Sequence, residues 1–130
     1  MILTVDLAGE VPIYQQLRDR VVEAMAAGEL PEGTSLPSIR TLASDSGINF
    51  HTVNKAYELL RQQGLIRLNR KTGAVVISTA ADPPFRTEWT ARARTLLAEA
   101  VARGVPTDEV LTTCRSVLDS FRAAQPEDLL

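Results

Sequence analysis

The sequence is poor in the residues that cross-link chains, bind metals or span membranes. Its 130 residues include one cysteine and one histidine, too few for a disulfide framework within the chain or for clustered metal ligands. Aromatic residues make up 5%, and no apolar run approaches the ~18 residues of a membrane-spanning helix. The first residues lack the basic segment and long apolar run of a signal peptide. We therefore expect a soluble, cytoplasmic protein with no bound metal and no cofactor.

The length and composition fit one globular domain or two very small ones. Hydrophobic residues make up 45% and charged residues 23% of the chain, which is ordinary for a globular protein and too apolar for a mainly disordered one. The sequence contains no glycine-rich phosphate loop and no pattern that pairs a nucleophile with a base. We therefore do not expect an enzyme.

Charge is distributed unevenly along the chain, although its formal net value is −2 at pH 7. Residues 1–35 contain two basic and six acidic residues, whereas residues 36–78 contain six basic and two acidic residues. Because the local field governs attraction to phosphate groups, the middle of the chain is the part suited to nucleic acid. A solvated surface with uneven charge accounts for the same counts, so charge alone leaves both interpretations open.

Three helical patterns are expected in the first half of the chain. Apolar residues recur at helical spacing after Pro12, and Gly28 ends this pattern. A short helix is expected over about residues 38–44, and a longer one over about 49–63 with Asn49 as its N-cap. The longer helix has a buried stripe spaced i, i+3, i+4 and i+7, formed by Val53, Ala56, Tyr57 and Leu60.

The second and third patterns have the spacing of a helix-turn-helix. Ala43 is the small residue needed where the two helices cross, and Gly47 allows the positive φ of a tight turn. An ordinary pair of helices has the same spacing, so the motif alone does not establish DNA binding. The outward face of the second helix begins with side chains able to contact base edges, and it consists of Asn49, Phe50, His51, Asn54, Lys55 and Glu58.

Two strand patterns follow the second helix directly, at residues 65–68 and 74–77. The polar segment between them predicts a hairpin with Arg70 and Lys71 at its tip. A helix-turn-helix followed by such a hairpin is a winged helix, in which the hairpin reaches a groove next to the one that the helix enters. At the other end of this region, residues 2–6 are expected to form a short strand or an extended arm.

The C-terminal part of the chain predicts two helices after a linker at residues 79–84, which Pro83 and Pro84 make stiff. The apolar stripes of these helices form too small a core by themselves, so we expect two copies to pair. Cys114 lies on the second stripe and is interpreted as a small hydrophobic core residue. The predicted dimerisation residues are Trp89, Leu96, Leu97, Val101, Val110, Leu111, Cys114, Val117, Leu118 and Phe121.

Several separated motifs, in this order, resemble the GntR superfamily of bacterial regulators. They are Pro12-Ile13-Tyr14-Gln15-Gln16-Leu17, Gly28-Glu29-Leu30, Leu36-Pro37-Ser38-Ile39-Arg40-Thr41-Leu42-Ala43, Thr52-Val53-Asn54-Lys55-Ala56-Tyr57-Glu58-Leu59-Leu60 and Gly64-Leu65-Ile66. The match covers roughly residues 10–78, and the short C-terminal part resembles the YtrA-type branch, whose last two helices dimerise. The resemblance implies a winged helix-turn-helix that binds an operator sequence.

The resemblance also implies which residues contact DNA. Arg40 matches an arginine that touches phosphate or base, and Arg70 and Lys71 match the tip of the wing. Phe50 departs from the family pattern, which usually has arginine there, so we expect its ring to contact a thymine methyl group instead of guanine. Packing of Phe50 within the fold is the alternative, and His51 is either a DNA contact or a solvated residue. The full predicted DNA-binding set is Ser38, Arg40, Asn49, Phe50, His51, Thr52, Asn54, Lys55, Arg70, Lys71, Thr72 and Gly73.

The sequence therefore predicts an α+β fold with a winged helix-turn-helix domain at residues 1–78, the linker at 79–84, and a two-helix dimerisation region at 85–130. We expect a homodimeric repressor that binds a pseudo-palindromic operator in double-stranded DNA. One alternative is a protein-binding winged helix, which the outward Phe50 and the acidic net charge favour. The other is a regulator that also senses a small-molecule effector between its C-terminal helices, which a thermal-shift screen would detect.

Overall fold

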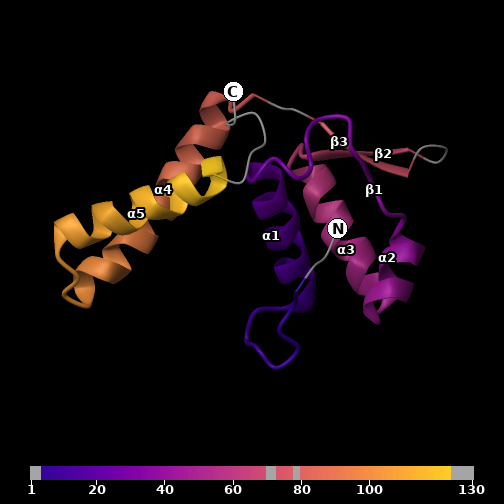
Figure 1. The fold of residues 1–130 in the computed structure, drawn as a ribbon, viewed down its shortest axis with the longest axis horizontal. Helices are drawn as coiled ribbons and strands as arrows, with labels where there is room; N and C mark the ends of the chain where they lie inside the picture. The colour runs from indigo at the N-terminus through magenta and orange to yellow at the C-terminus, as the bar shows by residue number, and fades with distance from the viewer. Residues whose placement is uncertain (1–3, 70–72, 78–79, 124–130) are drawn as a thin grey trace.

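A computed structural model describes residues 4–69, 73–77 and 80–123 of the chain. The described residues form helices and a three-stranded antiparallel sheet, so the fold is α+β as predicted (Figure 1). The elements in chain order are α1 (Ile13–Ala26), β1 (Ser35–Leu36), α2 (Ile39–Ser46), α3 (Phe50–Gln62), β2 (Ile66–Asn69), β3 (Gly73–Val76), α4 (Pro83–Ala102) and α5 (Thr107–Ala123).

The first six elements form one packed unit, which we call the head (residues 4–69 and 73–77). Helices α1 and α2 both pack against α3, and the sheet closes the other side of the core. The predicted stripe of α3 is confirmed, because each of its four residues is at most 1% exposed. The buried apolar residues of the head are Leu17, Val21, Leu30, Leu36, Leu42, Val53, Ala56, Tyr57, Leu60, Ile66, Ala74 and Val76.

The sheet contains a strand that the sequence analysis did not predict. Strand β3 lies in the middle, with β2 on one side and β1 on the other. Ser35 pairs with Val75, and Ile66 pairs with Val76. Two residues are too few to show a strand periodicity, so β1 exists only because β3 supplies its hydrogen-bonding partners.

The described part of the N-terminal segment, residues 4–6, does not join the sheet. Residues 1–3 lie outside the described residues, and residues 4–6 form neither helix nor strand. The side chain of Gln16, which is 8% exposed, accepts a hydrogen bond from the Asp6 N–H (2.6 Å) and donates to the carbonyl oxygens of Asp6 (2.9 Å) and Val11 (2.8 Å). A buried glutamine of α1 thus satisfies backbone groups that a strand partner would otherwise satisfy.

Helix α4 begins at Pro83, within the segment predicted to be a linker. The Asp82 side chain accepts a hydrogen bond from the Phe85 N–H at 2.9 Å and caps the helix. Proline lacks an N–H group, and the first turn of a helix has no intrahelical acceptor for one, so Pro83 and Pro84 fit there. The prediction that both prolines lie in a linker was therefore wrong.

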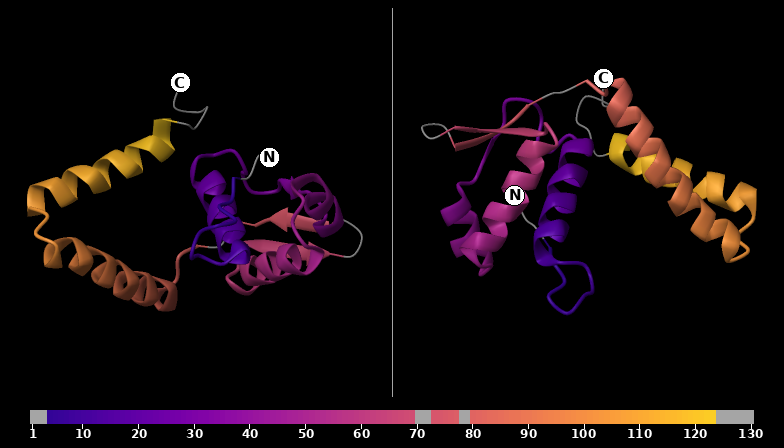
Figure 2. Two further views of the ribbon diagram at one scale, coloured as in Figure 1. Left: turned by 90° about the horizontal axis from the view of Figure 1, so that it is seen from below. Right: turned by 180° about the vertical axis from the view of Figure 1, so that it is seen from behind.

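Helices α4 and α5 form a hairpin that extends away from the head (Figures 1 and 2). The two helices diverge from their connecting turn, and neither contains a buried residue. The end of α5 contacts α1, where Phe121 is half-buried. Cys114 is exposed in the single chain, so its burial in a core between two copies stays a prediction. No helix of the described residues is long and apolar enough to cross a membrane.

Candidate nucleic-acid interface

Helices α2 and α3 form a helix-turn-helix around the predicted turn residue. Gly47 has a φ of 71°, a left-handed conformation that residues with a side chain rarely adopt. Ala43 is half-buried, and Val53 and Ala56 are buried beneath α2 as predicted. The buried stripe fixes the rotation of α3, so the opposite face of this helix points away from the head.

The first turn of α3 presents an exposed aromatic pair. Asn49 caps the helix, because its side-chain oxygen accepts a hydrogen bond from the His51 N–H at 2.8 Å. The ring of Phe50 is 44% exposed and meets the exposed His51 ring edge to face, with 5.7 Å between the ring centroids. Phe50 is therefore not part of the head's core, and the predicted outward face begins where the sequence placed it.

The second turn of α3 places Lys55 on the same outward side. Its side chain is exposed, and its ammonium nitrogen lies 4.0 Å from the centroid of the Tyr14 ring. Thr52 and Asn54 are half-buried. The sequence analysis did not place Tyr14 near the interface, because α1 and α3 are distant in the chain and only their packing brings the two residues together.

The start of α2 contributes Ser38 and Arg40. The hydroxyl of Ser38 accepts a hydrogen bond from the Thr41 N–H (3.0 Å) and donates one to Thr41 Oγ1 (2.9 Å), so it caps α2. The hydroxyl of the buried Tyr57 donates a hydrogen bond to the Pro37 carbonyl oxygen at 2.7 Å, which holds the segment before α2 against α3. Arg40 is the second residue of α2, and its side chain is exposed.

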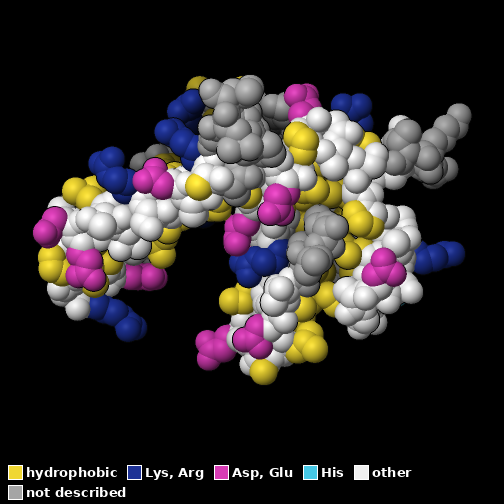
Figure 3. All heavy atoms as spheres, viewed as in Figure 1, with side chains coloured by type: hydrophobic (Ala, Val, Ile, Leu, Met, Phe, Trp, Pro, Cys, Tyr) yellow, Lys and Arg dark blue, Asp and Glu magenta, His cyan; other side chains and the backbone are white. Residues whose placement is uncertain are grey.

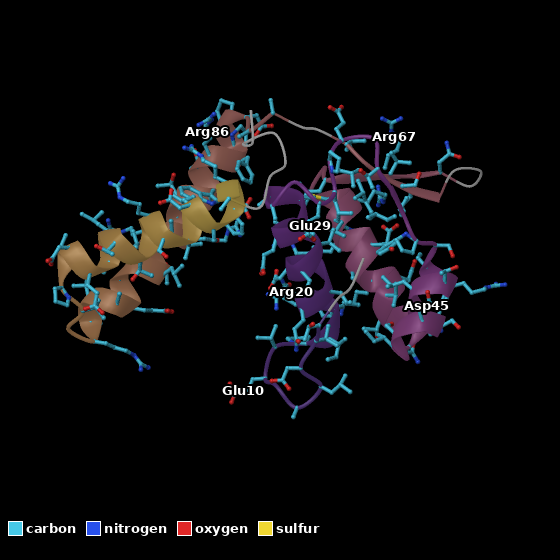
Figure 4. The ribbon with its side chains drawn as sticks, viewed as in Figure 1. Glu10, Arg20, Glu29, Asp45, Arg67 and Arg86 are labelled. Atoms are coloured by element: carbon cyan, nitrogen blue, oxygen red, sulfur yellow. The ribbon has the colours of Figure 1, made fainter. Side chains whose placement is uncertain are left out.

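The hairpin formed by β2 and β3 lies at one end of the head, above α2 and α3 in Figure 1. Gly73 begins β3 with a φ of 73° and pairs with Asn69. Arg70, Lys71 and Thr72, which were predicted at the tip of the wing, lie outside the described residues. Arg67 is exposed and lies on the side of the sheet away from α3 (Figure 4).

The charges of α3 separate into a paired and an unpaired group. Arg61 donates to Glu58 with 2.8 Å between Nη2 and Oε2, and this hydrogen bond lowers the pKa of the Glu58 carboxyl and raises the pKa of Arg61. Lys55 forms no ion pair with a carboxylate among the described residues. The interface side of α3 thus keeps a positive charge near the helix N-terminus, while the charges further along neutralise each other.

The described interface residues lie on the side of the head that faces away from the α4–α5 hairpin (Figures 1 and 2). They come from the start of α2, the first half of α3 and the base of the wing. The predicted dimerisation residues all lie in α4 and α5: eight are exposed, and Val110 and Phe121 are half-buried. Hydrophobic side chains reach the surface along both of these helices (Figure 3). Within the described residues, no cluster of His, Cys, Asp and Glu could hold a metal ion.

The chain matches known regulatory proteins. The profile of the family described as "Bacterial regulatory proteins, gntR family" matches residues 13–76. The chain is 35% identical over 74 residues to the HTH-type transcriptional regulator Rv1152 of Mycobacterium tuberculosis, covering 57% of this chain and 61% of that protein. It is 33% identical over 78 residues to the HTH-type transcriptional repressor YtrA of Bacillus subtilis, covering 60% of each. The chain thus spans about three fifths of the length of these two curated relatives.

A solved structure extends the likeness to most of this chain. YtrA from Sulfolobus acidocaldarius, a GntR-family transcription factor, is 39% identical, with a TM-score of 0.65 over 78% of this chain and 99% of that one. All three proteins are named as regulators, repressors or transcription factors, and none as an enzyme. The chain therefore belongs to the GntR family of bacterial regulatory proteins and is of the short YtrA type.

Proposed function

We propose that this protein is a sequence-specific DNA-binding repressor that acts as a homodimer on a pseudo-palindromic operator. The observation that carries the proposal is the orientation of α3. Its buried stripe fixes the helix in the head, and its N-terminal half exposes Phe50, His51 and Lys55 on the outward side. An exposed helix of this kind enters the major groove, where the side chains of its N-terminal half contact base edges.

Each proposed contact has a distinct role. Arg40 and Lys55 supply positive charge for the phosphate backbone, whereas Asn49, Phe50 and His51 contact bases. The oxygen of the Asn49 side chain already caps α3, so its amide N–H groups are the part offered to a base acceptor. Thr52, Asn54 and the wing residues Arg70, Lys71, Thr72 and Gly73 complete the proposed set, and Ser38 supports it by capping α2.

The proposed homodimer follows from the exposed apolar residues of the hairpin. A groove along α4, lined by Trp89, Ala93, Leu97 and Val101, is open to solvent, and Leu111 and Leu118 on α5 are 63% and 67% exposed. Exposed apolar surface along both helices supports an interaction site here. A second copy would bury it and place two α3 helices about 34–36 Å apart, or a multiple of that distance, on one face of the duplex.

The repressor role is proposed because the similar YtrA of Bacillus subtilis is named a transcriptional repressor. A reporter gene placed behind the bound sequence would test it, with lower expression in the presence of the protein as the expected result. Higher expression would indicate an activator.

The central experiment is the selection of bound sequences from a random pool of DNA duplexes by the full chain. We expect an enriched motif with twofold symmetry and footprints of two half-sites. A gel shift with the DNA upstream of the protein's own gene separates this proposal from a protein-binding winged helix, which the exposed Phe50 also fits. A pool without any enriched motif would contradict the proposal.

A further inference from the structure

Lys55 and Tyr14 form a contact that links the proposed recognition helix to α1. The ammonium nitrogen lies 4.0 Å from the centroid of the ring, well within the ~6 Å range of a cation–π interaction. Tyr14 is half-buried and packs against the core of the head, whereas Lys55 is exposed. The ring is thus a fixed element, and the flexible lysine lies upon it.

The charge pattern of α3 makes this lysine distinctive. The other cation of the helix, Arg61, is engaged by Glu58 at 2.8 Å, which neutralises it. An aromatic ring attracts an ammonium group without cancelling its charge. The contact with Tyr14 therefore holds a full positive charge at one place beside the N-terminal half of α3.

The placement of the two helices puts this charge at the edge of the interface. The beginnings of α1 and α3 lie at the same end of the head, and the helices pack along each other (Figures 1 and 2). A helix lying in the major groove is flanked by the phosphates of the groove's edge. A cation at the α1 side of α3 is placed to contact one of them.

We propose that Tyr14 is a positioning residue for DNA binding, whose ring holds the Lys55 ammonium group ready for a backbone phosphate at the edge of the groove. This inference rests on the proposed function, because Tyr14 would act only by holding Lys55 for a DNA phosphate. The ring covers one side of the ammonium group, and the remaining N–H groups stay available to phosphate oxygens. Holding the long side chain in place before binding reduces the entropy lost in forming the phosphate contact.

The contact has an opposite reading, in which the ring withholds Lys55 from DNA. The two interpretations predict opposite effects of one substitution on the affinity for DNA. Tyr14→Leu removes the ring but keeps an apolar side chain against the core, so it isolates the cation–π contact. We expect it to weaken DNA binding, whereas sequestration of Lys55 predicts tighter binding.

The experiment measures the affinity of the full chain for a labelled duplex of mixed sequence, between about 50 and 200 mM salt. Tyr14→Leu is expected to weaken binding about 2–5-fold per protomer, and Tyr14→Phe, which keeps the ring, less than about twofold. Lys55→Met is expected to reduce the slope of log affinity against log salt by about one unit per protomer. In the Lys55→Met background, Tyr14→Leu should have no further effect.

Arg61→Gln is the matched control, since it removes one positive charge from the same helix at a site already paired with Glu58. We expect it to change the salt slope less than Lys55→Met does, and thermal melts of all variants check that they fold. Equal losses for Tyr14→Phe and Tyr14→Leu, additive effects of Tyr14→Leu and Lys55→Met, or tighter binding by Tyr14→Leu would each overturn the inference. Wild-type protein that binds no duplex would overturn the proposed function as well, whereas normal wild-type binding with additive substitutions overturns this inference alone.

Discussion

The head and the α4–α5 hairpin differ in how far they bury their apolar residues. The head buries its apolar residues among its own helices and sheet, so that Val53 and Leu60 are 0% exposed. Helix α5 of the hairpin has apolar residues at comparable spacing, yet Leu111 and Leu118 are 63% and 67% exposed. Apolar periodicity therefore specifies which face of a helix is suited to burial. The head supplies the partner for that face within the chain, whereas for the hairpin we propose a second copy.

The difference follows from the number of elements that each region supplies. In the head, α3 has α1, α2 and the sheet around it, which is enough to enclose one stripe on every side. The hairpin has two helices that diverge from a turn, and two helices alone cannot enclose a core. The head should thus be stable by itself, whereas the hairpin should depend on a second copy.

Removal of residues 79–130 tests this division most strongly. The head should stay folded but become monomeric, and its affinity for the selected operator should fall by about 10²–10⁴-fold, since two linked binding units gain that much from avidity. Analytical ultracentrifugation and binding measurements check both parts. The full chain carrying Leu118→Asp is the control, and it should lose dimerisation without truncation. A stable dimer of residues 1–78 would contradict the division.

A pair of leucine substitutions compares the two regions within the full chain. Leu60→Ala should lower the free energy of unfolding by about 2–5 kcal/mol, because it leaves a cavity in a closed core. Leu118→Ala, at concentrations where the chain is monomeric, should change it by less than about 0.5 kcal/mol, because the side chain is already 67% exposed. Urea unfolding measures both values. Comparable losses at low concentration would mean that the hairpin is buried within a single chain.

Raising the pH above 10.0 should lower the free energy of unfolding of the head. Burial raises the pKa of Tyr57 to about 12 from 10.0, so the folded state opposes ionisation that the unfolded chain undergoes freely. The corresponding stability is fully present below pH 10.0 and is lost as the pH rises to about 12, a decrease of about 2–3 kcal/mol. Tyr57→Phe should remove this decrease, at a cost of about 0.5–1.5 kcal/mol at neutral pH for the lost hydrogen bond. An equally steep alkaline decrease in Tyr57→Phe would contradict the assignment.

Phe50 is the one large apolar residue of α3 that the head leaves exposed. Unlike the leucines of the hairpin, it lies beside polar groups, and we expect it to contact DNA. Phe50→Ala should weaken operator binding by about 1–3 kcal/mol per half-site, and Phe50→Arg should shift the selected base towards guanine at one position of each half-site. Selection from a random pool measures the preference. An unchanged motif together with a large drop in melting temperature would show instead that Phe50 supports the fold.

The features that depend on local pattern were predictable from the sequence. The stripe of α3 was correct residue by residue, because burial on one side imposes a helical period. Gly47 was correct because the turn needs a positive φ. The β2–β3 hairpin of the wing was recognisable from two strand patterns around a polar segment with glycine. The predicted start of α4 was wrong, because proline is common both in linkers and in the first turn of a helix. Here the Asp82 side chain caps α4, so Pro83 and Pro84 lie in its first turn.

Local periods and single turn residues in the sequence specify the order of the helices and of the two wing strands, the buried face of α3 and the residues that this face leaves outward. Three contacts become visible only in the folded chain: β1 pairs with β3, Gln16 hydrogen-bonds the backbone of Asp6, and Lys55 lies on the ring of Tyr14. Each of these contacts joins residues far apart in the chain or too few to form a pattern. Their partners are defined by packing, which no local period in the sequence records.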